Sequence, residues 1–389
     1  MPVMTFDCWP KRVHCKDGAV KDVPELIKDL GKKHAMIFTD PFMSKTPLVI
    51  DLAEDLKKNG IDVHIFSKIQ ANPVVATVEE AAEYMKEVKP DVLVCVGGGS
   101  PIDAGKVANV VYTHGGKAKD YDIAIGGILK IKPILLPLIA IPTTAGTGTE
   151  VTMVGVLTDV ERQTKFGVLS PLLIPDIAVL DPQATVSMPP GLTANTGIDA
   201  LTHCIECYTS NCDFPPAQGL ALEGIRMISK NLRRAVSDGK DIEARQAMLM
   251  ASMMAGTAFS LGGLGVCHAM AHQLSAFFDM PHGMANAILL PHVMEYNLKV
   301  AEDKFADIAE AMGGDIKGKS RSEAAKMALD LVKQLAADVN APKYLDDAGA
   351  TKDKIPGMVE RAMLDNPITQ NPQKPTEEDV TNIYLAAFR

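Results

Sequence analysis

Residues 91–106, with the sequence DVLVCVGGGSPIDAGK, decide the fold class of this chain. The apolar run 92–96 predicts a short buried strand, and the glycines after it predict a tight turn. Pro101 stands where a helix would begin, and proline suits a first helical turn because its missing N–H is not needed there. A strand, a glycine-rich turn and a helix in succession are typical of a parallel α/β sheet that binds a ligand at its loops.

The rest of the first half repeats this alternation of strand and helix. We expect strands at 35–39, 61–66, 134–141, 151–157, 164–169 and 177–180, and helices at 46–59 and 77–88. Thr77, with Glu80 three residues later, is the expected cap of the second helix. Because such units fold with right-handed crossovers, residues 1–187 are predicted to form a Rossmann-like α/β domain with a parallel sheet. The glycine-rich turn after the strand at 92–96 predicts that this domain binds a dinucleotide.

The second half has a helical pattern. The segment MPPGLTANTG (188–197) is interpreted as a linker that ends in a helix cap at Thr196. Helices are expected after it at 197–209, 216–234, 241–260, 264–278, 284–297, 301–312 and 320–337. Residues 188–389 are therefore predicted to form an all-helical domain, and we expect the active site in the cleft between the two domains.

Composition narrows the class of protein. A chain of 389 residues exceeds the size of about 250–300 residues at which single cores stop growing, so two domains are expected. The net charge of −9, without a basic stripe, argues against a nucleic-acid surface. No apolar run reaches the roughly 18 residues of a membrane span, and the first residues lack a secretory pattern. Seven cysteines in so long a chain indicate reduced thiols and a cytoplasmic location.

Five acidic and imidazole side chains in the helical half indicate a metal site. Asp199 and His203 stand four residues apart and would share one face of a helix. His268 and His272 form a second such pair, and His282 follows closely. One carboxylate with imidazoles suits a divalent transition ion, Fe2+ or alternatively Zn2+. Histidines on an apolar helix are usually core residues, and spacing leaves open whether His272 or His282 completes the set.

A second metal interpretation starts from three cysteines. Cys204, Cys207 and Cys212 lie close to His203 in the sequence and resemble part of a structural zinc cluster. However, the first two lie inside a predicted helix, and no second pair completes the array. We therefore expect these cysteines to be small buried side chains rather than ligands.

Two loops are candidates for binding a dinucleotide. The first contains Gly97, Gly98, Gly99, Ser100 and Asp103, where small residues let the backbone approach a diphosphate at a helix N-terminus. The pattern differs from G-x-G-x-x-G, so a tight turn with positive φ is the alternative. The second follows the strand at 134–141 and contains Thr143, Thr144 and Thr147.

Asp40 is the candidate for cofactor selection. It ends the strand at 35–39, where a carboxylate can bind a ribose hydroxyl and repel a 2′-phosphate. This position favours NAD over NADP. A strand-end aspartate that is merely solvated is an equally simple interpretation of the spacing.

Four stretches stand out together: GGGSPIDAGK (97–106), PTTAGTGTE (142–150), GIDALTHCIE (197–206), and LGVCHAMAHQLSAFFDMPHG (264–283) followed by NAILLPHV. In this order, over nearly the whole chain, they resemble the iron-containing (group III) alcohol dehydrogenases. The resemblance implies an α/β dinucleotide-binding domain followed by a helical metal-binding domain, a dehydroquinate synthase-like fold. It also implies NAD-dependent interconversion of a small primary alcohol or diol and its aldehyde, in a homodimer or larger homo-oligomer.

Matched motif by motif, the resemblance also implies roles for individual residues. The metal ligands fall on Asp199, His203, His268 and His282, and the cofactor-binding residues on Asp40, Asn72, Gly97, Gly98, Gly99, Ser100, Asp103, Thr143, Thr144, Thr147 and Lys165. His272 matches a histidine near the metal and the nicotinamide that is not usually a ligand, so it is our candidate for relaying the alcohol proton. The chain departs from the common family pattern at 258–261 and 266–267, on the substrate side, which leaves the alcohol undetermined.

Three other classes of protein share part of this pattern. A polyol dehydrogenase of the glycerol type shares the fold, but it generally uses one aspartate and two histidines. A dehydroquinate-synthase-like lyase would need more basic residues for a phosphorylated substrate. A non-catalytic metal or nucleotide sensor would explain the metal ligands and the glycine loop separately, but not why one chain contains both.

Overall fold

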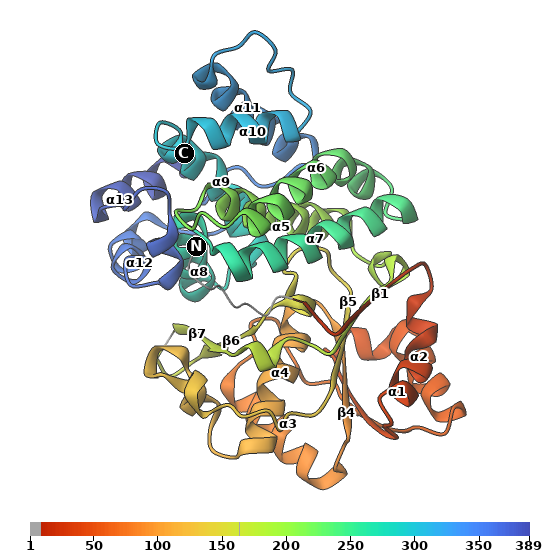
Figure 1. Ribbon diagram of the computed structural model, residues 1–389. Helices are drawn as coiled ribbons and strands as arrows, with labels where there is room; N and C mark the ends of the chain where they lie inside the picture. The colour runs from red at the N-terminus through yellow and green to blue at the C-terminus, as the bar shows by residue number, and fades with distance from the viewer. Residues whose placement is uncertain (1–8, 163) are drawn as a thin grey trace. The chain divides into compact units, whose positions relative to one another are not determined.

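The computed structural model describes residues 9–162 and 164–389 of the chain (Figure 1). They divide into two compact units. The first contains the chain up to Thr144 together with Gly148–Ser187, and the second contains Ala145–Thr147 and Met188–Arg389. The first unit is built around a parallel sheet and the second is helical, so the predicted fold class is confirmed.

The sheet of the first unit has the strand order β1-β8-β5-β4-β2-β3, and every pair in it is parallel. Its strands are β1 (Arg12–Cys15), β2 (His34–Phe38), β3 (Asp62–Phe66), β4 (Val92–Gly97), β5 (Leu138–Pro142) and β8 (Ile177–Leu180). The chain runs outward from β2 to β3 and then returns to β4 on the other side of β2. The order therefore reverses between β2 and β4, which is where open α/β sheets bind ligands.

Helices cover both faces of this sheet, as continuous apolar strands require. The helices are α1 (Val23–Asp29), α2 (Pro47–Lys58), α3 (Val75–Val88) and α4 (Gly99–His114). In β4, Leu93 and Cys95 join the core with α3 and α4, whereas Val94 and Val96 join the core with α1 and α2. The strands β6 (Val154–Asp159) and β7 (Thr164–Leu169) form a separate antiparallel hairpin.

The second unit consists of helices packed against one another. They are α5 (Pro190–Thr209), α6 (Pro215–Ser237), α7 (Ile242–Gly262), α8 (Val266–Phe278), α9 (His282–Asn297), α10 (Glu302–Ala311), α11 (Arg321–Asp338), α12 (Ile355–Ala362) and α13 (Glu377–Ala386). A Cβ at Gly224 would lie 2.6 Å from the Sγ of Cys204, and one at Gly262 would lie 2.7 Å from the Sγ of Cys207. These two cysteines fill close helix–helix contacts, which is the packing role expected of them.

Two predicted helix starts are wrong. α3 begins at Val75 and its N-cap is Val74, so Thr77 lies inside the helix. α5 begins at Pro190, so 188–197 is not a linker, and the Thr196 hydroxyl donates to the carbonyl of Leu192 within the helix. The interpretation of 188–197 as a linker did not allow for Pro190 at the first helical position, where proline is favoured.

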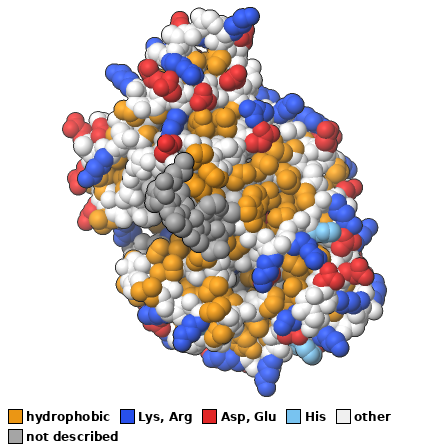
Figure 2. Space-filling view, viewed as in Figure 1, with side chains coloured by type: hydrophobic (Ala, Val, Ile, Leu, Met, Phe, Trp, Pro, Cys, Tyr) orange, Lys and Arg blue, Asp and Glu red, His pale blue; other side chains and the backbone are white. Residues whose placement is uncertain are grey.

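The surface carries both signs of charge. Acidic and basic side chains are intermixed over the face drawn in Figure 2. In the described part of the chain, no single helix is long and apolar enough to cross a bilayer. Only α7 and α8 taken together, which meet at a bend of 108°, have the required length and apolar content.

Candidate metal centre

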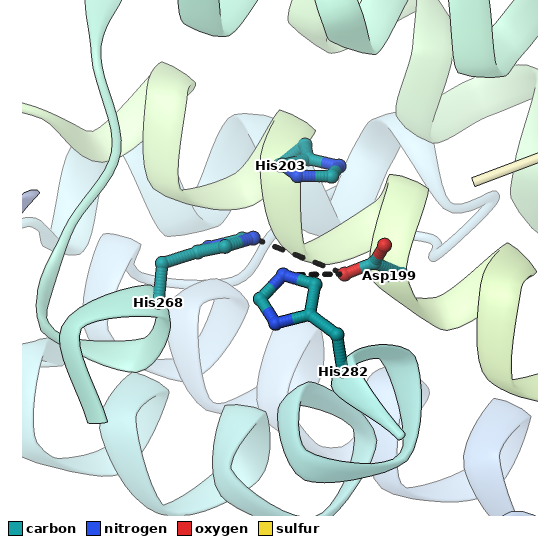
Figure 3. Close-up of side chains that lie close together, drawn as sticks. All are labelled: Asp199, His203, His268 and His282. Carbon is teal, nitrogen blue, oxygen red and sulfur yellow. Dashed lines mark ion pairs between the residues drawn. The ribbon is translucent and has the colours of Figure 1, made fainter. Parts of the chain in front are cut away.

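Four side chains from three helices converge inside the second unit (Figure 3). Asp199 and His203 lie one turn apart on α5, His268 lies on α8, and His282 is the first residue of α9. One ligand atom from each of these residues lies within 4.8 Å of the others. This is the set that the resemblance implied.

Close helix packing brings the ligands together. A Cβ at Gly283 would lie 2.6 Å from the carbonyl oxygen of Asn195, so glycine is needed where the first turn of α9 rests on α5. This approach puts the Nε2 of His282 at 3.7 Å from the Oδ1 of Asp199, and the Nε2 of His268 lies 3.8 Å from the same oxygen. Asn286, one turn further along α9, donates to that oxygen at 2.7 Å.

The electrostatics of the group suit a cation. Burial lowers the pKa of His203 and of His268, so both imidazoles are neutral and keep a lone pair for coordination. Burial also raises the pKa of Asp199, and a cation beside the carboxylate would offset that cost. The Nδ1 of His203 is buried without a hydrogen-bond partner. An unsatisfied buried polar atom costs about 1–3 kcal/mol, so this nitrogen lacks a partner that the protein alone does not supply. One carboxylate and three imidazoles form a donor set that fits Fe2+ or Zn2+.

His272 stands beside the ligand group rather than in it. Its ring stacks on that of His282, with the centroids 5.3 Å apart, and its Nδ1 lies 2.7 Å from the Oδ2 of Asp365. The side chain is 25% exposed, whereas that of His268 is 1% exposed. The geometry thus puts His282, and not His272, with Asp199. None of the cysteines of the alternative zinc cluster, all of them described, belongs to the group.

The two candidate dinucleotide loops contact each other in the first unit. Gly97 pairs with Pro142 in the sheet, and its carbonyl accepts from the N–H of Thr143 at 2.8 Å. A Cβ at Gly98 would lie 3.3 Å from the Oγ1 of Thr144. Gly97 has φ +153, and a Cβ there would lie 2.5 Å from the ring of Pro101. Gly97 is therefore required by the turn itself, and a side chain at Gly98 would be tight against Thr144; both positions also suit the close approach of a diphosphate.

The N-terminus of α4 completes the first loop. Gly98 is the N-cap, Gly99 begins the helix, and Ser100 lies in its first turn, where N–H groups have no partner within the helix. Such a terminus favours an anion. Thr147, which the resemblance assigned to the second loop, belongs to the short segment Ala145–Thr147 of the helical unit.

Asp103 braces the second loop. Its carboxylate accepts from the hydroxyl of Thr149, so it supports the loop from inside the protein. Lys106, one turn later in α4, is buried, which was not predicted from the sequence. Its Nζ donates to the carbonyl oxygens of Thr149, Thr152 and Val154. Burial lowers the pKa of Lys106 to about 8, and Asp103 opposes that shift.

Three more predicted cofactor residues, Asp40, Asn72 and Lys165, lie elsewhere in the first unit. Asp40 follows β2, and its Oδ1 accepts from the N–H groups of Phe42 and Met43 at 2.8 Å each. Lys165, on β7, donates to the Oδ1 of Asn72 at 2.8 Å. Asn72 and Lys165 are far apart in the sequence, and the fold brings them into contact.

Comparison with known proteins identifies the family. The chain matches the family description "Iron-containing alcohol dehydrogenase" over residues 10–182, and the C-terminal part of the Fe-containing alcohol dehydrogenase family over residues 193–388. The chain belongs to the iron-containing alcohol dehydrogenase family. This confirms the family that the motifs indicated.

Similar proteins agree with this family over the full length. The chain is 41% identical over 373 residues to the 1,3-propanediol dehydrogenase of Citrobacter freundii. This alignment covers 95% of each chain. It is 36% identical to the NAD-dependent methanol dehydrogenase of Bacillus methanolicus, over 95% of this chain and 96% of that one. A solved 1,3-propanediol oxidoreductase superposes with a TM-score of 0.96 at 39% identity, covering 99% of this chain and 100% of the other.

Membership of the iron-containing alcohol dehydrogenase family has direct consequences. It implies Fe2+ and NAD as cofactors, and it makes the chain an oxidoreductase acting on alcohols and aldehydes. The non-catalytic sensor is thereby set aside. The four converging side chains are consistent with the implied Fe2+.

Proposed function

We propose that this chain interconverts a small primary alcohol or diol and its aldehyde at one divalent ion held by Asp199, His203, His268 and His282. The convergence of these four ligand atoms within 4.8 Å carries the proposal. The names of the two relatives, a propanediol and a methanol dehydrogenase, favour a short substrate. When bound, the ion supplies a Lewis acid for the substrate oxygen, and NAD exchanges a hydride with the substrate carbon.

The surroundings of the ligands favour a small apolar substrate. The His203 ring lies between two other rings, with centroids 4.6 Å from that of Phe259 and 4.5 Å from that of His268. Phe259 therefore puts an apolar face next to a ligand. Such a face would exclude water and accept a short alkyl chain rather than a charged group.

The test of this function is an assay of the iron-loaded protein with NADH. Propanal, butanal and 3-hydroxypropanal are compared with glyceraldehyde and dihydroxyacetone, which represent the polyol alternative. We expect the simple aldehydes to have the higher kcat/KM. A preference for dihydroxyacetone would favour the polyol dehydrogenase, and no turnover with any of them would contradict the proposed reaction.

We further propose that His272 moves the alcohol proton. Its Nδ1 faces the carboxylate of Asp365, which can only accept a hydrogen bond when ionised. This contact puts the proton on Nδ1 and leaves Nε2 as the acceptor. Gln273 also donates to Asp365, which holds the carboxylate in place.

The His272→Ala variant should keep its metal and lose much of its rate. Positioned acid–base groups contribute about 10²–10⁴-fold, so we expect kcat to fall by about that factor and its pH dependence to change. Asp365→Asn should give a smaller loss, because the ring stays but its orientation is less defined. Steady-state kinetics over a pH series and metal analysis measure both effects. Unchanged kcat and pH profile in His272→Ala would reject the relay.

Asp40 should control the choice of cofactor. Asp40→Asn keeps an oxygen that can accept from Phe42 and Met43, so the turn is retained while the charge is removed. We expect kcat/KM with NADPH to rise about 10-fold, which corresponds to about 1.4 kcal/mol of relieved repulsion, with little change for NADH. Equal use of both cofactors by the unmodified protein would contradict a selective role for Asp40.

We also propose a cytoplasmic homodimer or larger homo-oligomer that binds neither nucleic acid nor membrane. The buried thiols of Cys95, Cys204, Cys207 and Cys267 support a reducing compartment. The net charge of −9 supports the absence of a nucleic-acid partner. Light scattering of the purified protein would give the mass of the assembly.

A further inference from the structure

Glu206 is a buried carboxylate at the end of the stretch GIDALTHCIE, and no role has been assigned to it so far. It lies on α5 one turn after His203 and is 4% exposed. Its Oε1 accepts from the backbone N–H of Cys267 at 2.7 Å, and its Oε2 lies 2.6 Å from the Nδ1 of His268. A charged side chain is almost never buried unless it is paired, so these contacts call for an explanation.

The first turn of α8 is shaped to receive this carboxylate. Gly265 is the N-cap of α8, and a Cβ there would lie 2.8 Å from the Oε1 of Glu206. Glycine therefore lets the carboxylate reach the backbone of the first turn. Negative charge is favourable at a helix N-terminus, which offsets part of the cost of burial.

The contact with His268 also determines which ring nitrogen faces the ligand group. Burial raises the pKa of Glu206 to about 7, and the backbone N–H groups at the start of α8 oppose that shift. The ionised carboxylate only accepts, and with it the hydrogen lies on Nδ1 of His268. The Nε2 of the same ring lies 3.8 Å from the Oδ1 of Asp199 and keeps its lone pair. Helix α5 thus contributes two ligands and also orients a third from another helix.

We infer that Glu206 is a positioning residue that selects the tautomer of His268 and thereby sets the affinity of the site for a divalent ion. This inference rests on the proposed metal site. A carboxylate that merely caps α8 would stabilise the helix without affecting the metal. The two roles can be separated because one carboxylate oxygen contacts the backbone and the other contacts the ring.

The Glu206→Gln variant separates the capping of α8 from the orientation of the His268 ring. If the amide oxygen still accepts the hydrogen bond from the N–H of Cys267, the NH2 group faces the Nδ1 of His268. That nitrogen must then accept a hydrogen bond from the NH2 group. The ring proton moves to Nε2 and blocks the lone pair. Groups that orient a ligand are worth about 10–100-fold in metal affinity, so we expect the dissociation constants for Fe2+ and Zn2+ to rise by that factor. Competition against a chromophoric chelator measures them without any assay of activity.

The matched control is Asn371→Ala. The Oδ1 of Asn371 accepts from the N–H of Val266 at 3.3 Å, in the same turn of α8, and makes no contact with the His268 ring that the structure shows. We expect this variant to melt at a lower temperature and to bind metal as the unmodified protein does. If both variants lose the same affinity, the effect comes from the helix end and the inference is wrong.

A second measurement needs no variant. In metal-free unmodified protein, 15N NMR of the imidazoles should show the Nδ1–H tautomer for His268, and the Nε2–H tautomer would overturn the inference. Metal binding by the unmodified protein tests the proposed metal site apart from the role of Glu206. If it binds no ion, the proposed site fails; if it binds an ion and Glu206→Gln binds it equally well, only the role of Glu206 fails.

Discussion

We expect the His268→Ala variant to lose its metal and its turnover together while it still binds NAD. His268 supplies one of the four ligand atoms, and its removal also leaves Glu206 as a buried carboxylate without its ring partner. A Lewis acid contributes several kcal/mol to such a reaction, so kcat should fall at least about 10³-fold. NAD binding should change little, because the glycine loop, Thr143 and Thr144 lie in the first unit and His268 lies in the second.

Three measurements on each protein check this expectation: metal content, kcat with an aldehyde and NADH, and calorimetric titration with NAD. His292→Ala is the matched control, because this histidine lies on α9, the helix of His282, but outside the ligand group. It should retain metal and turnover. Stoichiometric metal in His268→Ala would mean that the ion binds elsewhere.

Removal of the metal from the unmodified protein should abolish turnover, and Fe2+ should restore it. The ligand group has one carboxylate, and burial lowers the pKa of two of its imidazoles, those of His203 and His268, so these side chains cannot replace the positive charge that the ion provides. A ligand that binds only the folded state stabilises it by about 2.7 kcal/mol at 100 times its dissociation constant. The melting temperature of the metal-free protein should therefore rise on adding Fe2+, but not in His268→Ala.

Mg2+ is the control ion for this experiment. Adding back Mg2+, which prefers oxygen ligands, should restore neither turnover nor stability. Full activity after exhaustive chelation, with no ion detectable in the protein, would contradict the mechanism. Restoration by Zn2+ at the same level as Fe2+ would leave the site intact and change only the identity of the ion.

Much of the fold could be predicted because its signals are local. The strand β4, the glycine turn and α4 follow from one stretch of sequence, and the helices α6 to α11 follow from their periodicity. The order of strands could not be predicted, because it depends on pairings between segments far apart in the chain. The start of α5 was missed because Pro189 and Pro190 are equally compatible with a linker and with a first helical turn.

The candidate metal site could likewise be predicted only where its residues lie close together in the sequence. Asp199 and His203 could be paired from their spacing, because a helix puts them on one face. The choice between His272 and His282 could not be made from spacing, because it depends on how closely Gly283 lets α9 approach α5. Glu206 was missed because a charged residue in a helix is usually solvated. Its position on the same face of α5 as Asp199 and His203 was the available signal.

Anomalous diffraction from crystals of the active enzyme tests the central claim most directly. Data collected on both sides of the iron absorption edge should show one peak in the second unit, within about 2.0–2.2 Å of an imidazole nitrogen of His203, His268 and His282 and of a carboxylate oxygen of Asp199. A peak at another place, or active crystals with no peak among these four side chains, would contradict it.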